Sequence, residues 1–169
     1  HLNLSGFSST PKEINYGSSY TKENLDKSVL APYYSDKLWK PEQSFINFLD
    51  KSKQVVWWFK NGDRGSTFFA VPYLENNKEL PFYVDFIVQL KDGSIGLFDT
   101  KSGNTIKDAK EKSDGLRKYI SENKSLNLTG GIVTNTDQIN MNGRWIVYKE
   151  SGSKINQTDF SNWKTLDLN

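Results

Sequence analysis

The sequence contains no cysteine, and its single histidine is the terminal residue His1. Disulfide frameworks, zinc–thiolate sites and cysteine nucleophiles are therefore excluded. A Ser-His-Asp triad and an internal histidine ligand are excluded for the same reason. Any catalysis by this chain must use carboxylates, lysines, hydroxyl groups or a hard metal ion held by oxygen atoms.

Long hydrophobic runs and a strong excess of one charge are missing as well. No apolar stretch reaches the roughly 18–20 residues of a membrane span, and no signal-peptide pattern opens the chain. Together with the absence of cysteine, this predicts a cytoplasmic protein with no membrane partner. The 22 basic and 20 acidic residues leave a net charge of +2. A nucleic-acid partner must therefore be argued from a local patch of charge.

The length of 169 residues is enough for one domain with a hydrophobic core. Residues 1–37 are polar and weakly periodic, which predicts an irregular lead-in with a short helix near residues 22–29. Residues 38–169 carry the remaining pattern and form the single predicted domain. Because the chain begins with His1 rather than methionine, we expect a fragment of a larger protein.

Hydrophobic spacing predicts an α/β (α+β) fold. A helix begins near Pro41, because proline suits a first turn and the apolar residues that follow lie three and four apart. Strands are predicted at 54–61, at 66–74, twice within 83–103, at 128–135 and at 143–150. The first two are expected to form a hairpin across residues 61–66. The first four strands are expected to form an antiparallel meander, and a second helix at 105–123 links them to the last two strands. This order predicts a mixed sheet with helices on both faces.

The stretch YVDFIVQLKDGSIGLFDTKSG, residues 83–103, is typical of a β-hairpin, yet it carries charges among apolar residues. If residues 91–93 form a three-residue loop with a left-handed glycine, Asp85 lies opposite Asp99. Opposed residues share a face of the sheet. Lys101 is two residues beyond Asp99 and therefore shares that face too. This register would gather two carboxylates and a lysine.

A second register is also compatible with the sequence. A two-residue turn at residues 92–93 would place Asp85 opposite Thr100 and direct its side chain to the other face. The first register has a cost, because two opposed carboxylates repel each other. A divalent cation between them would remove that repulsion, and Mg²⁺ needs only one or two carboxylates from the protein. The alternative is that Asp99 and Lys101 form a surface ion pair.

A third carboxylate points to the same region. Glu42 precedes Phe45, Ile46 and Leu49 by three, four and seven residues, so it lies on the apolar face of its helix. An acid directed at a core is rarely left unpaired. Glu42 is therefore a candidate metal ligand, either directly or through water. The alternative is a favourable position for an acid in a first helical turn.

These residues carry a resemblance to a known family. Asp85, followed after thirteen residues by Asp99-Thr100-Lys101, resembles the PD-(D/E)xK nuclease signature, and the helix with Glu42 belongs to the same likeness. The ordered segments PEQSFINFLDKSKQVVWWFKN, FFAVPYL, FYVDFIV, FDTKSG and DAKEKSDGLRKYI are similar to the nuclease module of type III restriction-enzyme-like helicases. The similarity covers roughly residues 30–135. Val84 replaces the usual proline of that family, and Asp99 stands where glutamate is frequent.

The resemblance implies a restriction-endonuclease-like fold with an αβββαβ core and a Mg²⁺-dependent DNA endonuclease, with Mn²⁺ as a substitute. It implies that Asp85, Asp99 and the Thr100 carbonyl bind the metal, and that Glu42 completes the site. Lys101 is expected to position the attacking water and to stabilise the charge on the phosphate.

The resemblance also implies partners. A helicase or ATPase portion of the parent chain is expected, because this chain has no GxxxxGK[ST] loop. Cleavage of both strands would use a dimer. The predicted DNA contacts near the site are Lys112, Asn61, Lys60, Arg64 and Lys110. For two of these a local role is the alternative, namely an ion pair of Lys112 with Asp108 and a turn opened by Asn61.

Two other functions are compatible with the same residues. One is a nucleic-acid-binding module that has the fold but cleaves little or not at all. The other is a structural interaction domain in which the carboxylates form ion pairs.

Overall fold

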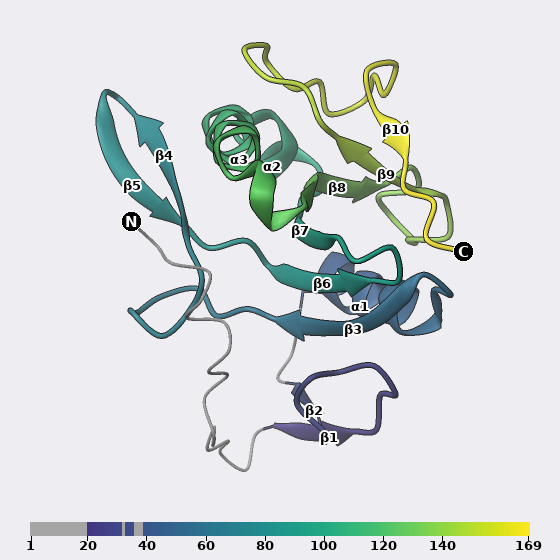
Figure 1. Ribbon diagram of the computed structural model, residues 1–169. Coiled ribbons are helices and arrows are strands. Elements are labelled where there is room, and N and C mark those ends of the chain that lie inside the picture. The colour runs from purple at the N-terminus through teal and green to yellow at the C-terminus, as the bar shows by residue number, and fades with distance from the viewer. Residues whose placement is uncertain (1–19, 32, 36–38) are drawn as a thin grey trace.

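The computed structural model describes residues 20–31, 33–35 and 39–169 (Figure 1). The predicted boundary between residues 37 and 38 and most of the lead-in therefore lie outside the described residues. Two short strands, β1 (Thr21–Glu23) and β2 (Tyr33–Ser35), pair antiparallel in a small separate sheet.

The predicted short helix near residues 22–29 is wrong. This segment starts as a strand and continues through bends alongside β3. The backbone N–H groups of Asp26 and Lys27 donate to the Asp50 carboxylate, and Trp58 exchanges backbone hydrogen bonds with Lys27 and Val29. Because these tertiary bonds use the backbone groups, they replace the local bonds of a helix.

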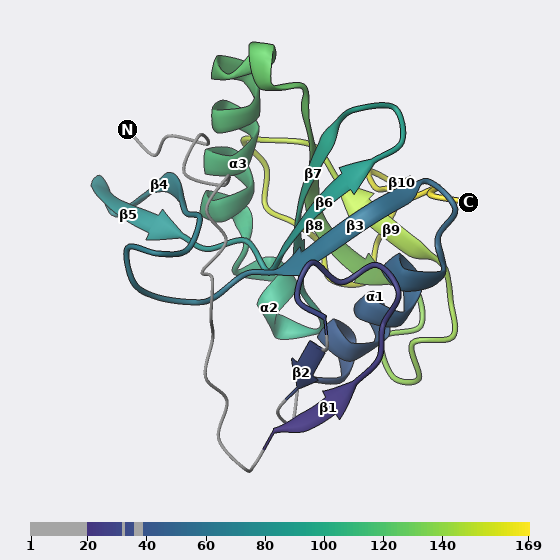
Figure 2. The same cartoon turned by 60° about the horizontal axis from the view of Figure 1, so that its bottom comes forward.

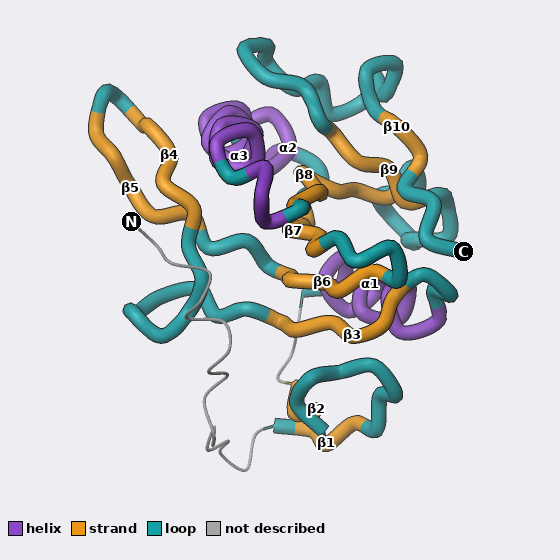
Figure 3. Tube along the Cα trace, in the orientation of Figure 1, coloured by secondary structure: helices purple, strands orange, loops and turns teal. Residues whose placement is uncertain are grey.

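The central sheet has six strands in the order β10-β9-β8-β7-β6-β3 (Figure 3). Their bounds are β3 (Val55–Lys60), β6 (Phe86–Leu90), β7 (Ile95–Thr100), β8 (Leu128–Asn135), β9 (Trp145–Tyr148) and β10 (Lys164–Thr165). The β7–β8 pair is parallel, and all other neighbours are antiparallel. The predicted mixed sheet is therefore confirmed.

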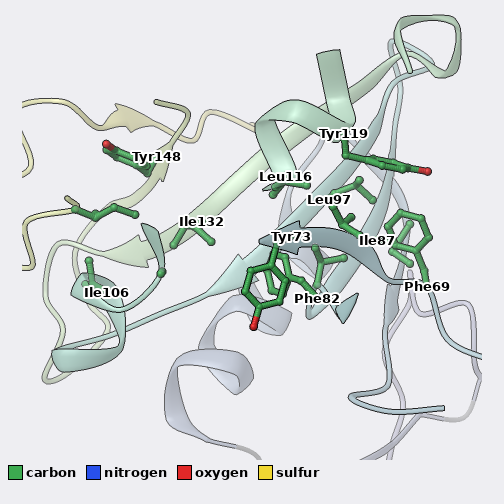
Figure 4. Packing of buried hydrophobic residues seen from close by; sticks show 14 of the residues in the cluster. Phe69, Tyr73, Phe82, Ile87, Leu97, Ile106, Leu116, Tyr119, Ile132 and Tyr148 are labelled. Atoms are coloured by element: carbon green, nitrogen blue, oxygen red, sulfur yellow. The ribbon is translucent and has the colours of Figure 1, made fainter. Parts of the chain in front are cut away.

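Helices cover both faces of this sheet, as predicted. One face packs against α1 (Lys40–Lys51), and the other packs against α2 (Asn104–Lys107) and α3 (Lys110–Glu122). The side chains of β6 alternate between the two cores, with Phe86 on the α1 side and Ile87 on the α3 side. Leu97, Leu116 and Tyr119 lie close together in the α3-side core (Figure 4). Within the described part of the chain, no helix is long and apolar enough to cross a membrane.

A second hairpin projects from the central sheet (Figures 1 and 2). It consists of β4 (Val71–Glu75) and β5 (Lys78–Phe82), which pair only with each other. The predicted hairpin between residues 54–61 and 66–74 is wrong, because β3 pairs with β6 instead. Strand β5 was not expected from the sequence. Asn76 and Asn77, with φ of 51° and 61°, form the turn, and such adjacent left-handed residues are typical of a two-residue hairpin.

The β6–β7 connection has the three-residue loop. The Leu90 N–H donates to the Ser94 carbonyl over 2.9 Å, and the Gly93 N–H donates to the Leu90 carbonyl over 3.0 Å. Gly93 has a φ of 87°, a conformation that glycine adopts without steric cost. The Asp92 carboxylate accepts bonds from both the N–H and the hydroxyl of Ser94. Of the two predicted registers, the first is therefore correct.

This register brings the two aspartates to one end of the sheet. Phe86 pairs with Phe98, so Asp85 and Asp99, one step further along, lie opposite each other. The same end is where β3 finishes, at Lys60, and where the chain turns into α2.

Gly115 lies where α3 packs against the β4–β5 hairpin. A Cβ atom at this position would lie 2.6 Å from Tyr73 Cβ and 2.9 Å from the Pro72 carbonyl oxygen. We therefore predict that Gly115→Ala lowers the free energy of unfolding by about 1–3 kcal/mol, although alanine favours helices by about 1 kcal/mol. Urea unfolding followed by circular dichroism measures the change. Ser121→Ala, at the exposed end of α3, is the control, and a Gly115→Ala protein as stable as the wild type would contradict this packing.

Candidate functional site

Three carboxylates and two lysines gather at this end of the sheet. Glu42 lies in the first turn of α1, Lys60 ends β3, Asp85 immediately precedes β6, and Asp99 and Lys101 lie at the end of β7. Lys60 Nζ is 3.3 Å from Glu42 Oε1 and 3.5 Å from Asp85 Oδ1. Lys101 Nζ forms an ion pair with Asp99 Oδ2. The four side chains predicted as catalytic are thus brought together.

Asp85 is held in place by Thr100. Its Oδ2 atom accepts a hydrogen bond of 2.8 Å from the Thr100 N–H and one of 2.6 Å from the Thr100 hydroxyl. Burial raises the pKa of Asp85, but the charges of Lys60 and Lys101 and the two bonds from Thr100 outweigh it and hold the pKa below its usual value. Asp85 is therefore an oriented, ionised carboxylate.

Asp99 has the most strained electrostatic environment of the group. Its side chain is only 2% exposed, and burial together with the neighbouring charge of Asp85 raises its pKa to about 7 despite the attraction of Lys101. Its buried Oδ2 atom contacts the ammonium group of Lys101 and has no other hydrogen-bond partner among the described residues. A further cation beside Asp99 would favour the ionised form.

Lys60 lies inside the site rather than on an outer face. Burial lowers its pKa, but the charges of Asp85 and Glu42 outweigh burial and raise it, so the ammonium group stays charged. Its Nζ atom also lies 5.3 Å from the centre of the Phe86 ring. Burial and the charge of Asp85 raise the pKa of Glu42, and Lys60 opposes this. From the sequence, Lys60 was predicted to contact DNA. Its role as a counter-ion was not predicted, because the pairing of β3 with β6 was not predicted.

The donor atoms are compatible with Mg²⁺, but only through two carboxylates. Among the described residues, no group of three or more His, Cys, Asp or Glu side chains is arranged to hold a metal ion. Asp85 and Asp99 supply a pair, which is sufficient for an ion that usually keeps several waters. The raised pKa of Asp99 is the feature that a cation would relieve. Glu42 is engaged by Lys60, so a contact of Glu42 with a metal would run through water.

The backbone carbonyl of Thr100 was predicted as a further metal ligand. It accepts a hydrogen bond of 3.3 Å from Lys101 Nζ, so it faces the same charged group. The Thr100 side chain is buried and bonds Asp85. The structure thus gives Thr100 a positioning role that the sequence alone did not indicate.

Two of the predicted DNA contacts lie on α3. Lys112 Nζ is 5.5 Å from the centre of the Phe82 ring, and its charge acts to lower the pKa of Asp99, so Lys112 faces the site. Lys112 and Asp108 do not form the alternative ion pair, and Asp108 directly follows the separate helix α2. Lys110 pairs with Asp114 over 2.8 Å.

The other two lie on the loop after β3. Arg64 is exposed and pairs with the adjacent Asp63 over 3.4 Å. Asn61 is buried, and its amide group donates to the carbonyls of Phe69 and Val84 over 2.7 Å and 2.9 Å. Asn61 therefore closes the loop and fixes the backbone immediately before Asp85.

The high pKa of Asp99 predicts a specific pH dependence. Between the usual value of 3.8 and about 7, the unfolded chain is ionised while folded Asp99 keeps its proton, so Asp99 lowers stability as pH rises through this range. We predict that Asp99→Asn gains stability relative to the wild type between pH 5 and pH 8, by on the order of 2 kcal/mol. Urea unfolding in a chelator measures this difference. Glu122→Gln, at an exposed position, should show none, and an equal pH profile for wild type and Asp99→Asn would refute the assignment.

Comparisons with known proteins place the chain in a family. Residues 26–157 match the YagJ family, a span that includes every residue of the site described above. Searches of curated proteins and of solved structures found no match. Since the matched segment makes up most of the chain, this protein belongs to the YagJ family.

Proposed function

We propose that this protein is a metal-dependent endonuclease of the PD-(D/E)xK type that hydrolyses phosphodiester bonds in DNA. The observation that carries the proposal is the convergence of Asp85, Asp99 and Lys101 at one end of an otherwise apolar pair of strands. Burying two ionised carboxylates side by side is unfavourable. The raised pKa of Asp99 shows that this unfavourable interaction remains in the folded protein. A site that binds a cation and a phosphate accounts for it.

The order of elements supports the proposed restriction-endonuclease-like core. Elements α1, β3, β6, β7, α3 and β8 follow one another in the chain, which agrees with an αβββαβ pattern. The strands β3, β6 and β7 are antiparallel neighbours, and β8 returns parallel to β7 after the helical crossover. The β4–β5 hairpin is then an insertion between the first two strands of the core.

Each residue has a defined part in the proposed reaction. Asp85, oriented by Thr100, and Asp99 would hold Mg²⁺. When bound, the ion would supply a lower pKa for water and positive charge against the phosphate. Water adds to phosphorus, the P–O bond to the leaving oxygen breaks, and the leaving oxygen takes up a proton. Lys101 stays charged because the attraction of Asp99 and Asp85 outweighs burial, so it positions the water and stabilises the extra negative charge.

A second function is favoured by a different observation. Lys60 and Lys101 already pair with all three carboxylates, and the described residues offer no three-carboxylate group for a metal. The site would then be a closed network of ion pairs in a module that binds nucleic acid, or another partner, without cutting it. The two functions differ in whether Mg²⁺ binds between Asp85 and Asp99.

Cleavage of DNA tests the nuclease directly. Supercoiled plasmid incubated with the protein and Mg²⁺ or Mn²⁺ should become nicked or linear. Asp85→Asn, Asp99→Asn and Lys101→Ala should each lower the rate by about 100-fold or more, because each removes a group that acts on the reacting phosphate. Glu122→Gln and Lys118→Ala, an exposed pair on α3, are the matched controls. Cleavage that persists in the site variants would come from a contaminant and would refute the proposal.

Metal binding separates the two functions without reference to activity. If Mg²⁺ binds at Asp85 and Asp99, it should stabilise the wild type at pH 8 by about 2.7 kcal/mol at a concentration of 100 times its Kd. Asp99→Asn should lose this stabilisation, and Glu122→Gln should keep it. Thermal unfolding with and without Mg²⁺ measures the effect. No response of the wild type would favour the closed ion-pair network.

A further inference from the structure

The loop of residues 136–144, which joins β8 to β9, is attached to the elements that carry the candidate site. Gln138 Oε1 accepts hydrogen bonds from the Gly103 N–H over 2.6 Å and from the Ser102 hydroxyl over 3.5 Å, directly after Lys101. On the other side, Lys40 Nζ donates to the Ile139 carbonyl over 2.8 Å. Lys40 begins α1, two residues before Glu42. In Figure 2 the loop extends from the sheet on the side of α1.

The conformation of this loop is fixed from within. Asn135 is 1% exposed. Its Oδ1 atom accepts bonds from the N–H groups of Asp137 and Gly143, both over 2.9 Å, and its amide donates to the carbonyls of Met141 and Gly143. Asp137 Oδ1 in turn accepts hydrogen bonds from the N–H groups of Ile139 and Asn140, which form the tip of the loop. The tip therefore has little freedom to fold back onto the protein.

Ile139 occupies that tip and is 80% exposed, against 57% for Leu74, the next most exposed large apolar residue described. Holding an isoleucine in water on a fixed loop forfeits the free energy that its burial would give. Proteins that bend DNA use such side chains as wedges, which they insert between base steps. An apolar tip beside a phosphodiester site is suited to that contact.

The polar groups around Ile139 match a nucleic acid. Asn140, Asn142 and Arg144 are exposed, and the Arg144 guanidinium takes part in no ion pair or hydrogen bond with the described residues. Amide and cationic side chains of this kind contact phosphates and base edges. The acid in the loop, Asp137, is engaged by the loop's own N–H groups. The loop carries one acid and one base, so its net charge gives no preference, and the choice of duplex DNA follows from the position of the loop beside the proposed nuclease site.

We propose that the 136–144 loop is a DNA-contacting element in which Ile139 inserts between base steps and Arg144 binds a phosphate. The inference rests on the proposed function for the choice of ligand. The loop would set where the DNA backbone lies relative to Lys101. Gln138 accepts a hydrogen bond from the Gly103 N–H, so the loop is attached to the chain just after this lysine.

Binding to duplex DNA tests the proposal. Fluorescence anisotropy in Ca²⁺, repeated in a chelator, gives the affinity, and 2-aminopurine in the duplex reports unstacking. Ile139→Ala should weaken binding roughly tenfold and abolish the rise in 2-aminopurine fluorescence. Arg144→Ala should weaken binding and reduce the slope of log K against log salt by about 1. Leu74→Ala, on the β4–β5 hairpin, is the matched control and should change neither. Thermal melting checks that each variant is folded.

The outcomes separate this inference from the proposed function. Binding and unstacking that depend on Ile139 would support it even in a wild type that never cleaves, and the nuclease proposal would then fail alone. Cleavage with an unaffected Ile139→Ala variant would overturn the loop's role and leave the nuclease intact. A wild type that binds no duplex, or self-association without DNA that depends on Ile139, would also overturn it.

Discussion

Compensation of buried negative charge is the constraint on which the rest of this structure depends. Asp99 lies in β7 and is almost fully shielded from water. The β6–β7 register places Asp85 opposite it. Two ionised carboxylates in such a place need cations. Lys101 directly follows β7, which carries Asp99, whereas Lys60 comes from β3 and also reaches Glu42 on α1. One electrostatic requirement thus ties α1 to β3, to β7 and to the chain that enters β6.

The rest of the fold makes this arrangement rigid. The central strands are apolar on both faces, so α1 and α3 clamp the sheet from either side. Thr100 bonds Asp85 with both its N–H and its hydroxyl, and Asn61 fixes the backbone that leads into Asp85. Such support from neighbouring groups is what a site needs if its charged atoms are to be held ready for a ligand. The position of the 136–144 loop follows from the same region, since its bonds reach both α1 and the chain after β7.

The two proposed functions differ in one physical respect, which is the cation that completes the neutralisation of the carboxylates. With lysines alone, Asp99 keeps a pKa of about 7, although Lys101 contacts its buried Oδ2 atom. The raised pKa of Asp99 is therefore the reason to prefer a site that binds a metal and a phosphate over a purely structural network of ion pairs.

The sequence by itself determined the features that depend on residues close together in the chain. The spacing around Phe45 predicted the buried face of α1, and the Lys91–Gly93 loop limited the hairpin to two registers, one of which gathers Asp85, Asp99 and Lys101. Only the tertiary structure decided what depends on distant pairing. Strand β3 joins β6 rather than the strand that follows it, which brings Lys60 into the site. A strand's hydrophobic pattern shows which faces are buried, but not which neighbour completes its hydrogen bonds, because any edge offers the same backbone groups.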